Sequence, residues 1–166
     1  MLAVIFIIAL LSVLVFTNYK SGGSQLALQR SASKLAQDIR RAEEMAMSSE
    51  ECKKCTPPTT IPPRYGIKFN TAVPDSYIFF ADINENGTFE GPDELVDTVT
   101  LEKGVKIDKI FADGIPKSLG IVTFQPPDPI VYIRDPGNRS ILKVQLIGGN
   151  GTKAIIVNKT GLIYVQ

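Results

Sequence analysis

Residues 28–46 read LQRSASKLAQDIRRAEEMA, and this stretch decides the fold. Its apolar side chains recur at steps of four, three, four, three and four residues, the spacing of one helix face. They are Leu28, Ala32, Leu35, Ile39, Ala42 and Ala46. Polar residues fall mostly on the other faces. We therefore predict an amphipathic helix over residues 19–49, with its apolar face packed against a sheet.

The residues before this helix form an apolar run. Residues 1–16 read MLAVIFIIALLSVLVF, with Ser12 as the one polar side chain and no charge before Lys20. As a helix the run spans about 26 Å, slightly less than the ~30 Å hydrocarbon core of a bilayer. A cleaved secretory signal would need a basic start and a small-residue cleavage site, and neither is present. A buried core helix is the other alternative, but this run is apolar on all faces and lies at the very terminus of the sequence. We expect residues 1–18 to be a transmembrane helix that continues into the amphipathic one, with a kink at Gly22–Gly23 or a restart capped by Ser24.

Residues 50–63, EECKKCTPPTTIPP, follow the helix and contain the two cysteines of the chain, Cys52 and Cys55. The prolines end any helix and favour an irregular loop. A zinc site needs about four ligands, and the chain has no histidine and no second CxxC. We favour a local disulfide over two free thiols, and both over a metal or redox role.

Residues 64–166 alternate short Ile, Val, Phe and Tyr runs with Gly, Pro, Asn and Asp turns, the pattern of an antiparallel β domain. Alternation within a run, as in Leu142–Ile147, predicts one buried and one wetted sheet face. The amphipathic helix would cover the buried face, so the predicted fold class is α+β. The expected strands are Tyr65–Asn70, Tyr77–Asp82, Leu95–Leu101, Val105–Phe111, Ile121–Phe124, Ile130–Arg134, Leu142–Ile147, Lys153–Val157 and Leu162–Val165.

One predicted hairpin contains a candidate calcium loop. Asp82, Asn84, Asn86, Gly87 and Asp93 match the spacing D-x-[DN]-x-[DN]-G-x5-E, with Asp in place of the final Glu. Alternate carboxylate and amide oxygens suit Ca²⁺, and Glu90 or Glu94 would add another ligand. The alternative is a simple hairpin loop in which Asn-Gly supplies the positive φ of the turn. Both interpretations stay open.

The segment SASKLAQDIRRAEEMAM (31–47), the preceding Asn18-Tyr19 pair and the downstream YGIKF (65–69) resemble the type IV pilin superfamily. The similarity is greatest to its GspH/FimT branch, the H-type minor pseudopilins of type II secretion and their pilus relatives. Precursors in that family carry a basic leader, a Gly-Phe type cleavage site and an early glutamate. None occurs here, so we expect the true start to lie upstream, or else an uncleaved relative. No cleavage or methylation residue is assigned.

This resemblance implies a structural role. A minor pseudopilin sits in the bacterial inner membrane as a single-pass protein, with its C-terminal domain on the periplasmic side. Its implied partners are other pseudopilins or pilins through the N-terminal helix, membrane lipid, and the secretion or pilus assembly machinery. This function requires no cofactor. Calcium, at the candidate loop, is the one ion that the sequence suggests.

Two other classes of function are less favoured. Some FimT-like relatives bind DNA through a basic C-terminal region, but here the tail reads NKTGLIYVQ, with only Lys153 and Lys159 nearby and a net charge of +1 for the chain. Phosphate contacts need several cations, so nucleic acid is an unlikely partner. An enzyme is also unexpected, because the chain has no histidine and no visible pairing of nucleophile and base.

Overall fold

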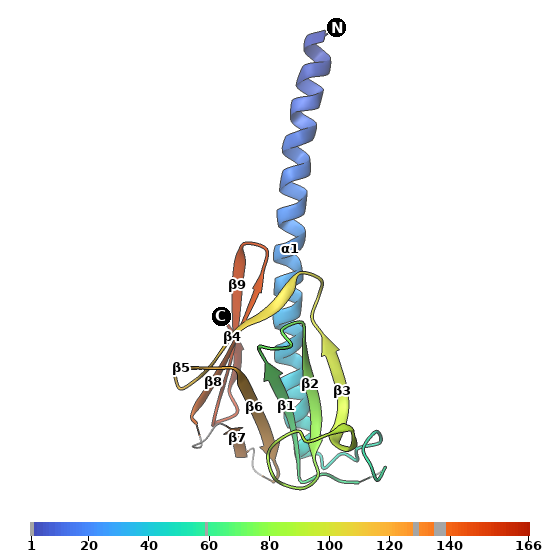
Figure 1. The fold of residues 1–166 in the computed structure, drawn as a ribbon, viewed down its shortest axis with the longest axis vertical. Helices are drawn as coiled ribbons and strands as arrows, with labels where there is room; N and C mark the ends of the chain where they lie inside the picture. The colour runs from blue at the N-terminus through green and yellow to red at the C-terminus, as the bar shows by residue number, and fades with distance from the viewer. Residues whose placement is uncertain (1, 59, 128–129, 135–138) are drawn as a thin grey trace.

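The computed structural model describes residues 2–58, 60–127, 130–134 and 139–166. Within the helix, side chains are described at Val4, Phe6, Ile7 and Leu10 and from Gly23 onward. The α-helix α1 (Leu2–Met47) runs through Gly22 and Gly23 without interruption, so Ser24 lies inside it and is not the N-cap of a restarted helix. Its C-terminal half is embedded in the β domain and its N-terminal half projects away from it (Figure 1).

In the described part of the chain, ten antiparallel strands form two five-stranded sheets. The first sheet has the order β3-β2-β1-β6-β7. Its strands are β1 (Arg64–Asn70), β2 (Ser76–Asp82), β3 (Leu95–Thr100), β6 (Leu119–Gln125) and β7 (Ile130–Arg134), and a short 3-10 helix η1 (Pro92–Glu94) precedes β3. The second sheet has the order β10-β9-β8-β4-β5. Its strands are β4 (Val105–Ala112), β5 (Ile115–Lys117), β8 (Ile141–Gly148), β9 (Gly151–Asn158) and β10 (Ile163–Val165).

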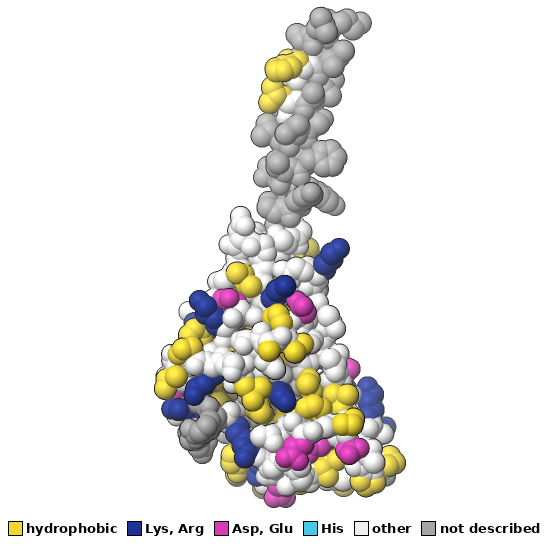
Figure 2. Space-filling view, viewed as in Figure 1, with side chains coloured by type: hydrophobic (Ala, Val, Ile, Leu, Met, Phe, Trp, Pro, Cys, Tyr) yellow, Lys and Arg dark blue, Asp and Glu magenta, His cyan; other side chains and the backbone are white. Residues whose placement is uncertain are grey.

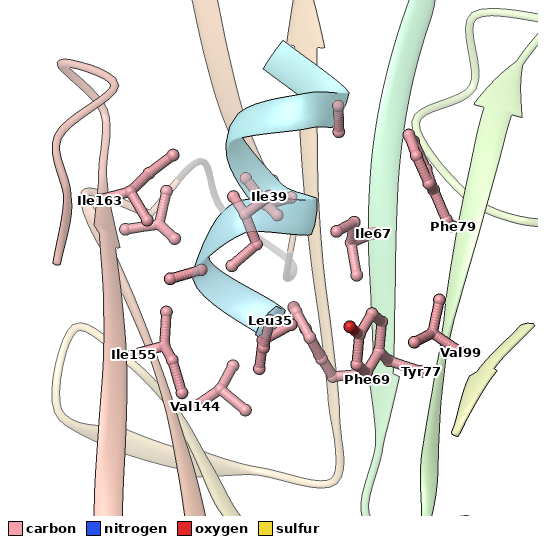
Figure 3. Packing of buried hydrophobic residues seen from close by; sticks show 14 of the residues in the cluster. Leu35, Ile39, Ile67, Phe69, Tyr77, Phe79, Val99, Val144, Ile155 and Ile163 are labelled. Atoms are coloured by element: carbon pink, nitrogen blue, oxygen red, sulfur yellow. The ribbon is translucent and has the colours of Figure 1, made fainter. Parts of the chain in front are cut away.

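The core lies where α1 meets both sheets. Leu35 and Ile39 are fully buried. Figure 3 shows them between Ile67 and Phe69 of the first sheet and Ile155 of the second. Because the helix contacts strands of both sheets, it joins two β layers into one core.

The predicted fold class was wrong. The structure is mostly β, with two sheets where one was expected, because the apolar runs of the sequence show which faces are buried but not where one sheet ends and the next begins. Among the residues that the structure describes, no helix is long and apolar enough to cross a membrane. The membrane-spanning first half is therefore not upheld, and most side chains of residues 1–18 lie outside the described part.

Polar contacts fasten the helix to each sheet. The Tyr77 hydroxyl of β2 donates to Asp38 Oδ2 at 2.5 Å. On the other side, Arg40 Nη2 donates to the Ile163 carbonyl oxygen at 2.9 Å. Hydrogen bonds to charged groups contribute about 1.5–3 kcal/mol, so these two fix the rotation of the helix between the layers.

The buried tyrosines predict how stability changes in alkaline solution. Burial raises the pKa of Tyr65 to about 12, with a smaller contribution from the Glu50 carboxylate. Burial and the hydrogen bond to Asp38 raise the pKa of Tyr77 further. Unfolded tyrosines ionise near pH 10. Each buried tyrosine therefore lowers the free energy of unfolding by about 1.4 kcal/mol per pH unit above pH 10, until the pH reaches its folded-state pKa.

Urea unfolding followed by circular dichroism between pH 8 and pH 11.5 measures this loss. Tyr77→Phe should lower the free energy of unfolding by about 1–2 kcal/mol at pH 8. It should also make the decline above pH 10 shallower. If the free energy of unfolding declined equally steeply above pH 10 in the parent and in Tyr77→Phe, the raised pKa of Tyr77 would be contradicted.

Candidate functional site

The connection between β2 and β3 places several oxygen-bearing side chains in one loop. Asp82, the last residue of β2, is fully buried, and its Oδ2 accepts the Gly87 N–H at 2.8 Å. The backbone is left-handed at Glu85 (φ 59°) and Gly87 (φ 72°), a conformation that glycine adopts without strain. The chain therefore curls back over the Asp82 carboxylate.

Asparagine side chains hold the curled loop. Asn84 Oδ1 accepts the Asn86 N–H at 3.0 Å, and Asn86 Oδ1 accepts the Thr88 N–H at 2.7 Å. Asn84 Nδ2 donates to Glu90 Oε2 at 3.1 Å. Asn86 Oδ1 also accepts the Thr88 hydroxyl at 2.7 Å, which occupies both of its lone pairs, whereas Asn84 Oδ1 has a second lone pair beyond its turn.

Glu94 closes the loop from its far end. It is buried in η1, and its Oε2 accepts the Glu90 N–H at 3.0 Å. Burial raises the pKa of Glu94, the Glu90 N–H lowers it, and the Asp82 carboxylate raises it. Burial also raises the pKa of Asp82, which the Gly87 N–H and Arg64 lower. The Asp82 carboxylate thus disfavours the ionised form of Glu94.

Arg64 compensates one oxygen of Asp82. The pairing of β1 with β2 sets Arg64 opposite Asp82, and Arg64 Nη1 lies 3.6 Å from Asp82 Oδ2. The same nitrogen donates to the Glu85 carbonyl at 3.2 Å, and the guanidinium stacks on Tyr132, 4.5 Å from the ring centre. Arg64 is therefore held on one side of Asp82, at Oδ2.

The predicted calcium residues are only partly brought together. Asp82, Asn84 and Asn86 share the loop, while Asp93 is exposed in η1. Glu94, one position beyond the pattern, is the buried acid. Within the described ranges there is no group of three or more Asp, Glu, His or Cys side chains arranged to hold a metal. Any cation here would need amide and main-chain oxygens besides the two carboxylates.

The cysteine loop packs beside this one. Cys52 and Cys55 are joined in a disulfide, and both are buried. The Cys52 N–H donates to the Thr60 carbonyl at 2.8 Å, and the Thr56 N–H donates to the Asp93 carbonyl at 3.0 Å. The disulfide therefore braces a segment that supports η1 from outside.

A second candidate surface is the projecting half of α1. Four large apolar side chains are described there, and each is 50–68% exposed: Val4, Phe6, Ile7 and Leu10. Phe6 and Ile7 lie three to four residues before Leu10, which places these three on one side of the helix. Figure 2 shows hydrophobic side chains at this end, far from the domain.

Comparison with known proteins gives no relative. No family model matches the chain, and neither a curated protein nor a solved structure is significantly similar to it.

Proposed function

We propose that this chain is a structural subunit of a pilin-like filament, and that it assembles through the projecting half of α1. One observation carries the proposal. The helix extends beyond the domain that it helps to build, and its described side chains there are large, apolar and exposed. The resemblance of residues 18–19, 31–47 and 65–69 to pilin-like proteins supports the same conclusion.

Energetics favour an apolar partner for this segment. Fully burying a Val, Leu, Ile or Phe side chain contributes about 1.5–3 kcal/mol, so half-exposed ones still offer about 1 kcal/mol each. An exposed apolar stripe on a single helix matches the packing of like helices against one another. Neighbouring subunits of a filament would supply such helices side by side.

The β domain is attached to the helix in a fixed orientation. Contacts with both sheets, together with the Asp38–Tyr77 and Arg40–Ile163 hydrogen bonds, prevent the helix from turning within the domain. The orientation of the domain in a filament would then follow from the packing of the projecting half. Loops at the far end of the domain would face outward and supply contacts with neighbours or cargo.

The double variant Phe6→Lys with Leu10→Lys tests this function in the full chain, expressed in its source cell. Two lost apolar contacts of about 1 kcal/mol each should lower recovery in the sheared filament fraction about tenfold or more. Immunoblotting of the filament fraction against the whole-cell level measures the effect.

Leu162→Lys is the matched control. Leu162 is 56% exposed on the β domain, so the change places a charge on an equally exposed apolar residue away from α1. Its recovery should equal that of the parent. Normal recovery of the double variant would reject assembly through this part of the helix.

A further inference from the structure

The β2–β3 loop contains two buried carboxylates that the filament proposal does not use. Asp82 is 0% and Glu94 5% exposed. Asp82 Oδ1 and Glu94 Oε1 are buried and have no hydrogen-bond partner among the described residues. Buried polar atoms are normally satisfied, and buried charges are normally paired or coordinate a metal. Two such oxygens at the same loop therefore indicate a missing partner.

A cation that meets both oxygens would add to Arg64 and Arg134, which already favour the charged form of Asp82, and would reach the loop from its surface. Arg64 and the Gly87 N–H both contact Oδ2 of Asp82, not Oδ1. The lining of a surface recess includes Asn84, Glu90 and Glu94, so the unsatisfied acid borders a space open to solvent. A small cation could enter there without disturbing either sheet.

We propose that this loop binds a divalent cation, Ca²⁺, through Asp82 and Glu94, with the Asn84 amide oxygen and main-chain oxygens of the loop completing the donors. Carboxylate, amide and main-chain oxygens are all hard ligands, and Ca²⁺ accepts six to eight of them in variable geometry. Mg²⁺ demands a near-ideal octahedron and keeps most of its waters, which a loop of mixed carboxylates and amides does not impose. This site is independent of the filament proposal.

The local backbone already has the shape that such a site needs. Successive asparagine turns and the left-handed Glu85 and Gly87 curl the chain around Asp82. Glu94 is the last residue of η1, and β3 begins directly after it at Leu95, so no long helix follows the loop. The ligand set would therefore differ from the sequence pattern by using Glu94 in place of Asp93.

Calorimetric titration of the full chain in mild detergent, after removal of ions with EGTA, tests the site. We expect heat of binding for CaCl2 with one site per chain, and a rise of several degrees in the unfolding temperature at saturating Ca²⁺. Glu94→Gln should weaken Ca²⁺ binding by roughly tenfold or more while keeping the size of the side chain. MgCl2 should give a clearly smaller response than CaCl2.

Glu102→Gln is the matched control, because Glu102 is an exposed acid in the turn after β3 and lies outside the β2–β3 loop. It should bind Ca²⁺ like the parent. If Glu94→Gln does not fold, Asn84→Ala replaces it, since Asn84 is exposed, and the same loss of affinity is expected. Absence of Ca²⁺ binding by the parent, parent-like affinity in the variant, or an equal response to Mg²⁺ would each overturn the proposal.

Discussion

Leu35→Ala should lower the free energy of unfolding by about 3–5 kcal/mol. Leu35 is fully buried where the helix meets both sheets, close to Phe69, Val144 and Ile155 (Figure 3). Removing three carbons there costs their transfer free energy and leaves a cavity that two sheets cannot close together. Urea unfolding followed by circular dichroism gives the difference directly.

Leu26→Ala is the control on the same helix. Leu26 is 49% exposed, so the identical substitution should change the free energy of unfolding by no more than about 0.5 kcal/mol. A similar loss from both variants would mean that the helix contributes through its intrinsic helicity. A loss confined to Leu35→Ala would attribute the stability to packing against the sheets.

Gly66→Ala should destabilise the protein by about 3 kcal/mol. A Cβ at Gly66 would lie 2.6 Å from the Val122 carbonyl oxygen and 2.6 Å from Thr123 Cγ2, both on the paired strand β6. Overpacking of a core costs about 1–3 kcal/mol, and here one clashing atom belongs to the backbone of a central strand, which cannot rotate away. Thermal unfolding of the variant measures the cost.

A companion variant separates the two clashes in Gly66→Ala. Adding Thr123→Ser removes the methyl group but not the Val122 carbonyl, so it should restore only part of the lost stability. Gly23→Ala serves as the control, because a Cβ there meets nothing within 4 Å. It should leave stability unchanged or raise it by up to about 1 kcal/mol, as for glycine in a helix interior. Parent-like stability of Gly66→Ala would contradict the close approach of β1 and β6.

The sequence located the elements of this fold better than their arrangement. The six positions predicted for the apolar helix face are all buried, and every expected strand has an observed counterpart with ends within two residues. β5 was not expected, because Ile115–Lys117 is a short strand centred on a proline. The division into two sheets was missed as well. A helical period shows how wide a buried stripe is, but not how many layers cover it.

The candidate site shows the same limit. Spacing alone selected Asp82, Asn84 and Asn86, since their turns are formed within a few residues. It placed Asp93 at the last ligand position and Glu94 only as an added donor, because the pattern counts residues along the chain, whereas η1 exposes Asp93 and buries Glu94. Arg64 carried no local signal. Its position opposite Asp82 is set by the pairing of β1 with β2.

The most direct test of the proposed function is photo-cross-linking from position 6 of the full chain in its source cell. Phe6 is replaced by a benzophenone amino acid, and the adducts are identified by mass spectrometry. Phe6 is 68% exposed on the projecting half of α1, and the probe keeps its aromatic character. Filament assembly predicts adducts to the N-terminal helix of a neighbouring subunit, while the same probe at Leu162 gives none to that helix. Adducts to lipid alone, or no adduct at position 6, would contradict assembly through this helix.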